Sequence, residues 1–279
     1  MTIWYTICDL LPFPWVSLTF MKNALLAVCV MAPLFGLLST NIVTGRMSFF
    51  SDALGHSAFT GIAIGVLCGM SAPIWCAVAL SILISILFTC VRAKTEQSAD
   101  TIIGVFSSTA VALGIFIATL GGGSFTKFNQ YLIGDILSVT PGEIGLLALV
   151  LLAVVAIWLF CSNRILLTTI HPQLASSRGI SIRRNEMLFT TVIAVVVTLA
   201  ISWVGLLVIN SLLVLPAASA RNLARNMRQY VLFSVLAALI CSIGGLFVSY
   251  EIGCSAGATI SLLLALWFTI SSLFRKSRQ

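Results

Sequence analysis

The chain has 279 residues, of which 59% are apolar and 8% are charged, and its mean hydropathy is +1.12. Soluble domains carry about 25% charged residues, so this composition excludes a soluble globular protein and predicts an all-α polytopic membrane protein. The net charge of +7 is typical of basic residues retained in cytoplasmic loops, and it gives no reason to expect nucleic acid as a partner rather than membrane lipid.

Residues 1–21 hold Trp4, Tyr5, Trp15 and two prolines, without the basic first region and small-residue cleavage site of a signal peptide. Aromatic side chains of this kind favour the membrane–water interface. We therefore expect an interfacial segment at 1–21, followed by a single transmembrane domain at 22–279.

Seven uncharged runs follow, and each reaches or exceeds the roughly 20 residues that a spanning helix needs. The longest is interrupted by Gly69, Ser71 and Pro73, which predicts two helices joined by a tight turn. The sequence thus predicts about eight to nine transmembrane helices, drawn from runs at 23–45, 53–91, 101–126, 144–163, 187–220, 229–250 and 252–274.

Asp52 and His56 stand at the start of the longest run, which contains no other ionisable group apart from its thiols. A charged group at membrane depth costs roughly 2.5–3.5 kcal/mol on insertion scales, so such residues are functional by default. Four residues apart on a helix, both side chains face the same way. A carboxylate and an imidazole together form half of a coordination shell for a divalent transition metal. The alternative is that Asp52 caps a helix and His56 bonds a neighbouring carbonyl.

Small residues follow this pair at every fourth position, which leaves one face of the helix nearly bare of side chains. Such a face favours close helix packing over pathway lining. The residues are Ser57, Gly61, Gly65 and Gly69.

The run at 187–220 lies between Arg183, Arg184 and Arg221, all of which favour the cytoplasm, so it must leave that side and return. It is shorter than the roughly 40 residues that two full spans need. The sequence therefore predicts a re-entrant hairpin with one short arm and a break near Gly205. Irregular backbone at membrane depth is tolerated where it lines a cavity or is buried in protein, which marks 205–215 as a pathway or gate element.

The basic residues also predict the orientation, because cytoplasmic loops retain Lys and Arg. With the C-terminus inside, only Lys22 and Lys127 fall outside. The remaining thirteen lie in the cytoplasm: Arg46, Arg92, Lys94, Arg164, Arg178, Arg183, Arg184, Arg221, Arg225, Arg228, Arg275, Lys276 and Arg278.

Three further features have ordinary explanations. Thr140-Pro141-Gly142-Glu143 predicts a capping box, which assigns Glu143 to backbone amides. Residues 253–257 spell the G-x-S-x-G of a serine hydrolase, but they lack its strand–turn–helix context and a nearby histidine, so we expect a glycine-rich external turn. Asp135, on the external side, is either a turn residue or part of a binding-protein or gate contact.

Several stretches together resemble the membrane subunits of the manganese, zinc and iron family of ATP-binding-cassette importers. The resemblance covers about 22–274. It rests on Arg46-Met-Ser, Ser51-Asp52-Ala53-Leu54-Gly55-His56-Ser57 with Gly61, Ile103-Gly104 to Ala112-Leu113-Gly114, Tyr131 to Leu137, Val204-Gly205-Leu206-Leu207 to Leu215-Pro216 and on to Arg221, and Ser255 to Ile260.

The resemblance implies a permease of the cobalamin and siderophore type, located in the bacterial cytoplasmic (inner) membrane, that imports Mn²⁺, Zn²⁺ or Fe²⁺. It implies a second permease copy or a paralogue, two cytoplasmic ATP-binding subunits and an extracytoplasmic metal-binding protein as partners. The chain lacks the phosphate-binding loop G-x-x-x-x-G-K-[ST], since no Lys follows a Gly. We therefore expect no enzymatic activity and no permanently bound cofactor, with ATP used by the partner. The alternative is a secondary metal transporter that is driven by an ion gradient.

The resemblance also assigns contacts with the ATPase. The segment from Pro216 to Arg228 is implied to form the coupling helix, with Arg221, Arg225 and Arg228 spaced four and three apart on one helical face. The stretch that contains Ala175 and Gly179 resembles a second cytoplasmic contact with the ATPase. The alternative is a basic stripe at the lipid headgroups, which is compatible with the coupling role.

Overall fold

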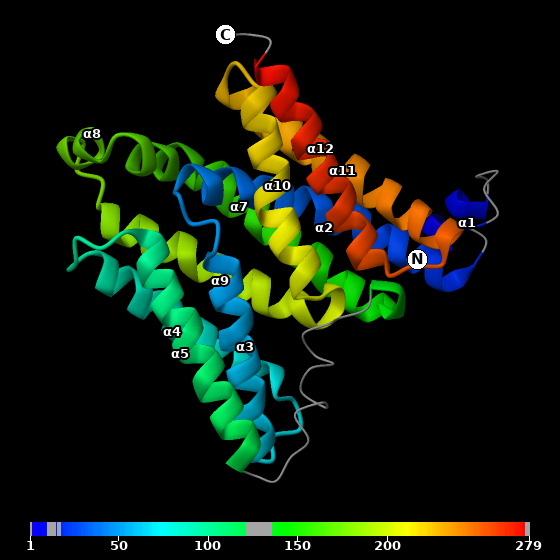
Figure 1. Cartoon of the computed structure of the whole chain (residues 1–279), viewed down its shortest axis with the longest axis horizontal. Helices are drawn as coiled ribbons and strands as arrows, with labels where there is room; N and C mark the ends of the chain where they lie inside the picture. The colour runs from blue at the N-terminus through cyan, green and yellow to red at the C-terminus, as the bar shows by residue number, and fades with distance from the viewer. Residues whose placement is uncertain (1, 10–14, 16–17, 121–135, 277–279) are drawn as a thin grey trace. The chain divides into compact units, whose positions relative to one another are not determined.

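The computed structural model describes residues 2–9, 15, 18–120 and 136–276 of the chain, and within this part every regular element is a helix (Figure 1). The elements are α1 (Thr2–Asp9), α2 (Thr19–Thr44), α3 (Phe50–Leu67), α4 (Ile74–Arg92), α5 (Ala99–Leu120), η2 (Ile136–Ser138), α7 (Pro141–Ile170), α8 (Pro172–Ser177), α9 (Ile182–Val204), α10 (Leu206–Leu223), α11 (Met227–Ile252) and α12 (Ala256–Lys276).

Nine helices in the described part are long and apolar enough to cross a membrane, and the chain is a multi-pass membrane protein. The all-α fold class predicted from composition is therefore confirmed. The nine helices are α2, α3, α4, α5, α7, α9, α10, α11 and α12. The last part of the predicted run at 101–126, beyond Leu120, lies outside the described residues, as does Asp135.

Both predicted breaks within long apolar runs are present. The first separates α3 from α4, and Gly69 in it has a φ of 67°. The second separates α9 from α10 at Gly205, whose φ of 87° and ψ of 152° belong to a region open almost only to glycine. The chain therefore bends after Val204 without a side chain to obstruct it, and α10, with 18 residues, is the shorter arm.

Polar contacts hold the N-terminal segment against the start of α2. The Trp4 indole donates a hydrogen bond to the carbonyl of Lys22 (2.9 Å), and the Tyr5 hydroxyl bonds Oδ1 of Asn23 (2.7 Å). The Lys22 ammonium lies 5.7 Å from the centroid of the Tyr5 ring, within cation–π range. The segment therefore docks on α2, which begins at Thr19, three residues before the predicted boundary.

The chain divides into two compact units, one of 1–40, 135–155 and 203–279 and the other of 41–134 and 156–202. In the second unit α3 packs against both α4 and α5, and the three run side by side in Figure 1. The hydroxyls of Ser57 and Ser81 lie 3.1 Å apart between α3 and α4, while Thr60 donates to the carbonyl of Ala110 on α5 (2.6 Å).

A second set of contacts in this unit joins α4 to α9. The Arg92 guanidinium bonds the carboxylate of Glu186 at 2.6 Å, and the hydroxyls of Thr89 and Thr190 lie 3.1 Å apart. Arg92 and Glu186 satisfy each other's charge, so they stabilise the helix ends where the sequence places the cytoplasmic surface.

In the first unit α12 packs against α10 and α11. A Cβ added at Gly245 of α11 would lie 2.7 Å from Cα of Ile260, so glycine is required for α12 to approach this closely. Thr259 donates to the Gly245 carbonyl (2.9 Å), and Asn222 of α10 donates to Ser271 of α12 (3.1 Å).

Local capping agrees with two sequence interpretations. The Glu143 carboxylate accepts the backbone N–H of Thr140 at 2.7 Å, which is the predicted capping interaction at the start of α7. Residues 253–255 form the turn between α11 and α12, with Gly253 at a φ of 74°, and Ala256 and Gly257 are the first residues of α12. The G-x-S-x-G motif thus joins two helices rather than a strand and a helix.

Candidate functional site

The candidate site is built on the first two turns of α3. Asp52 lies in the first turn, where the helix dipole favours a carboxylate. Nε2 of His56 lies 3.4 Å from Oδ2 of Asp52, so the two side chains meet on the same face. The N-cap position belongs to Phe49, not to Asp52.

The pair lies on the open side of an otherwise buried helix. From Phe50 to Gly65 only Asp52, His56 and Ile64 are not buried, and they share one side of α3. The side chains of His56 and Asp52 are 28% and 41% exposed. An ion could therefore reach both groups, while the rest of the helix is held by α4 and α5.

Within the described residues no group of three or more His, Cys, Asp or Glu side chains could hold a metal ion. Asp52 and His56 thus bring one oxygen and one nitrogen ligand type together, which is fewer than the four ligands of a closed zinc site. A two-ligand arrangement needs water or a second protein chain to complete the shell, and it suits transient contact with an ion rather than permanent storage.

The predicted stripe of small residues divides into two groups. A Cβ added at Gly61 would lie 2.4 Å from Cα of Ala77, and one at Gly65 would lie 2.9 Å from Cα of Pro73, so these positions face α4 at close range. Ser57 faces α4 through its bond to Ser81. Gly69 does not pack against a helix: it is exposed in the turn after α3, with nothing within 4 Å of an added Cβ.

The predicted continuous arginine face is wrong, because a helix ends inside it. α10 ends at Leu223, the backbone at Ala224 is extended with a ψ of 144°, and α11 begins at Met227. The three exposed arginines therefore lie on three different pieces of backbone: Arg221 in the last turn of α10, Arg225 in the connection, and Arg228 in the first turn of α11.

Side-chain capping causes this break. Oδ1 of Asn226 accepts the backbone N–H of Gln229 (2.9 Å), and Oε1 of Gln229 accepts that of Arg225 (3.0 Å). The spacing of Asn226 and Gln229 is an N-terminal helix signal that the sequence does carry. Pro216, assigned to the same cytoplasmic segment, is instead buried within α10, so it is not part of an exposed contact surface.

The second assigned contact contains the short helix α8 and the turn after it. Ala175 in α8 is fully buried, whereas Gly179 is exposed and has a φ of 72°. Only Gly179 of these two is available to a partner; Ala175 holds the segment in place.

Most of the chain is similar to known membrane transport proteins. Residues 17–275 match the model of the ABC 3 transport family. The chain is 29% identical over 255 residues to the high-affinity zinc uptake system membrane protein ZnuB of Haemophilus influenzae, covering 91% of this chain and 97% of that protein. It is 31% identical over 256 residues to the manganese import system permease protein ScaB of Streptococcus gordonii, covering 90% of each. The structure of PsaBC from Streptococcus pneumoniae in complex with Fab superposes with a TM-score of 0.79 at 26% identity, covering 100% of both chains.

Proposed function

Because the chain belongs to the ABC 3 transport family, we propose that it is the permease subunit of an ATP-driven importer for a divalent transition metal ion. Relatives named for zinc uptake and manganese import support Zn²⁺ or Mn²⁺ as the substrate. The observation that carries the proposal is the Asp52–His56 pair, a carboxylate and an imidazole on the open side of a buried transmembrane helix.

In this proposal the pair replaces part of the ion's hydration as the ion passes. The Asp52 carboxylate supplies charge and an oxygen ligand that suits Mn²⁺, and the His56 imidazole supplies a nitrogen ligand that suits Zn²⁺. A second copy or a paralogue of the chain would contribute an equivalent pair, which gives four protein ligands across a dimer. Such a site binds weakly enough to release its ion, as conduction requires.

The proposed energy source is a separate pair of ATP-binding subunits on the cytoplasmic side. Arg221, Arg225 and Arg228 in the α10–α11 connection, with Gly179 near α8, form the proposed contact surface. In this proposal the chain lies in the inner membrane of a bacterium. Its basic residues support a cytoplasmic position for this surface and for the C-terminus, because cytoplasmic loops retain Lys and Arg. An extracytoplasmic binding protein would deliver the ion from the other side.

The experiment that tests this function is metal accumulation in cells that co-express the chain, its ATPase partner and its binding protein. We expect one of zinc, manganese or iron to accumulate only when the ATPase can hydrolyse ATP. A matched strain with a hydrolysis-deficient ATPase is the control for expression. Accumulation that persists in that strain would identify a secondary transporter driven by an ion gradient and contradict the proposal.

The proposed contact with the ATPase can be tested by reversing the charge of one arginine. Arg221→Glu should reduce the amount of ATPase that co-purifies with the chain by about tenfold, the change that ~1.4 kcal/mol produces, because it replaces attraction to an acidic partner surface by repulsion. Arg164→Glu, an exposed arginine on α7 outside the proposed surface, is the matched control. Equal retention of ATPase by both variants would remove Arg221 from the contact.

A further inference from the structure

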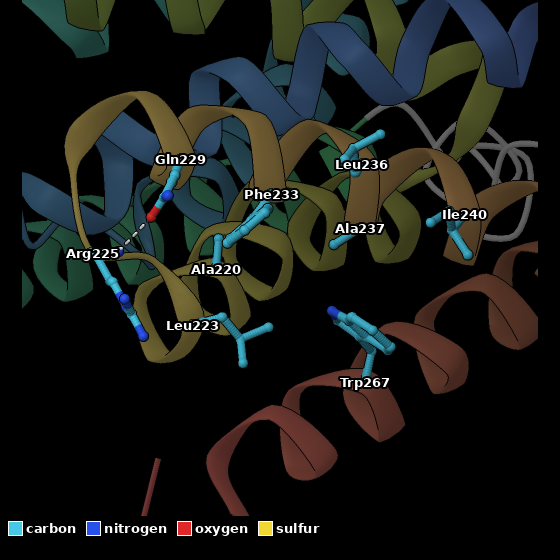
Figure 2. Close-up of a pocket in the computed structure, with 9 residues that line it drawn as sticks. All are labelled: Ala220, Leu223, Arg225, Gln229, Phe233, Leu236, Ala237, Ile240 and Trp267. Carbon is cyan, nitrogen blue, oxygen red and sulfur yellow. Dashed lines mark hydrogen bonds between the residues drawn. The ribbon is translucent and has the colours of Figure 1, made fainter. Parts of the chain in front are cut away.

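A groove in the first unit is not explained by metal transport. It has a volume of about 460 Å³ and lies between the end of α10 and the facing sides of α11 and α12 (Figure 2). Its walls are mostly apolar, and its polar side chains, Arg225 and Gln229, lie together at one end. The lining residues are Ala220, Leu223, Arg225, Gln229, Phe233, Leu236, Ala237, Ile240 and Trp267.

We propose that this groove binds the acyl chain of a phospholipid of the cytoplasmic leaflet, with an anionic headgroup held at Arg225. This inference is independent of the metal pathway. It rests on the length, the lining and the charge distribution of the groove.

The length of the groove matches one leaflet. Its lining on α11 runs from Gln229 to Ile240, which at 1.5 Å per residue is about 16 Å. Half of a hydrocarbon core of roughly 30 Å is about 15 Å. A groove that starts at the helix ends and reaches this depth accommodates one chain along the membrane normal.

The lining is polar at one end of the groove and apolar further along it, as the headgroup and the acyl chain of a lipid are. Arg225 and Gln229 lie at the end formed by the α10–α11 connection, and Phe233, Ala237 and Ile240 follow along α11 (Figure 2). Ala237 is a small, buried residue in the wall, so it leaves room that a larger side chain would fill. Trp267 of α12 faces this row across the groove.

The charge at the mouth selects the headgroup. Among the lining residues, the positive charge belongs to Arg225, which is exposed at this end of the groove. Residues 206–276 contain a single acidic residue, Glu251, which lies near the other end of α11, about 36 Å from Met227 at helical rise. Within 206–276 no acidic side chain lies near this end of the groove, whereas anionic lipids attract basic residues at the cytoplasmic surface. A phosphodiester without a compensating positive group therefore fits better than a zwitterionic headgroup.

The test uses the full-length chain in vesicles of equal parts phosphatidylglycerol and phosphatidylethanolamine. The protein is then extracted in detergent, and native mass spectrometry counts the retained lipids. The native chain should retain phosphatidylglycerol several-fold over phosphatidylethanolamine. Arg225→Gln should lose that preference, and Ala237→Phe should lose retained lipid of both kinds. Ile240→Trp also fills the groove, and because Ile240 is exposed, this variant should fold even if Ala237→Phe does not. It should likewise lose retained lipid of both kinds.

Two matched controls separate the groove from the general membrane surface. Leu232→Phe adds bulk to an exposed position of α11 outside the groove, and Arg228→Gln removes an exposed arginine that does not line it. Both should retain lipid as the native chain does. Equal retention of the two lipids by the native chain, the same loss in Arg228→Gln as in Arg225→Gln, or unchanged retention in Ile240→Trp would each overturn the proposal.

Discussion

Replacing Asp52 or His56 by alanine is expected to lower metal uptake by at least about tenfold. Among the described residues, Asp52 and His56 are the two ionisable side chains on the open side of α3, and each substitution removes one of these two ligands. Loss of one of a few ligands raises the free energy of the passing ion, and ~1.4 kcal/mol is sufficient for a tenfold slower step. The measurement is the initial rate of accumulation of the transported metal, normalised to the membrane level of each variant.

The matched control for this prediction is Asp100→Ala. Asp100 is an exposed carboxylate in the first turn of α5, in the same unit of the fold. It should leave uptake close to the native rate, because its carboxylate has no partner imidazole one turn away. A similar loss in Asp52→Ala and Asp100→Ala would indicate a general effect of negative charge on ion entry rather than coordination by the pair.

Gly61→Ala is expected to destabilise the protein by about 1–3 kcal/mol, the usual cost of overpacking a core. The added Cβ would lie 2.4 Å from Cα and 2.8 Å from the backbone N of Ala77. Both atoms belong to the backbone of α4, so the collision cannot be relieved by a change of rotamer, and α3 must move away from α4. The measurement is the thermal unfolding midpoint of the purified protein in one detergent.

Gly104→Ala gives the opposite expectation and serves as the control. Gly104 lies within α5, and nothing is found within 4 Å of an added Cβ. Alanine should therefore leave the unfolding midpoint unchanged or raise it, since glycine within a helix costs roughly 0.5–1 kcal/mol relative to alanine. If both variants shifted the midpoint by the same amount, close approach of α3 and α4 would not be the cause.

Much of the fold could be predicted because membrane spans leave a strong signal in composition. The uncharged runs correspond to the nine helices, and the breaks at Gly69 and Gly205 followed from run length together with glycine and proline. Helix ends were harder to predict. The run at 144–163 stops at Arg164, but α7 continues to Ile170, because a charged residue ends an apolar run without ending the helix.

The candidate site was partly visible in the sequence. Asp52 and His56 stand out because ionisable groups are costly in an apolar run, and their spacing on a helix brings them within 3.4 Å. The arginine segment does not form the predicted single helical face, because spacing alone does not show a helix end, whereas Asn226 and Gln229 carry a capping signal that begins a new helix there. The groove beside Phe233 and Trp267 could not be predicted, since apolar residues that line a groove have the same pattern as those that face lipid.

The most direct test of the central claim is uptake of radioactive zinc or manganese into vesicles that contain the purified chain with its ATPase partner. Rates are compared with and without ATP on the ATPase side, for the native chain and for the Asp52→Ala, His56→Ala double variant. Our account predicts uptake that requires both ATP and the native pair. ATP-driven uptake at the native rate in the double variant would contradict it.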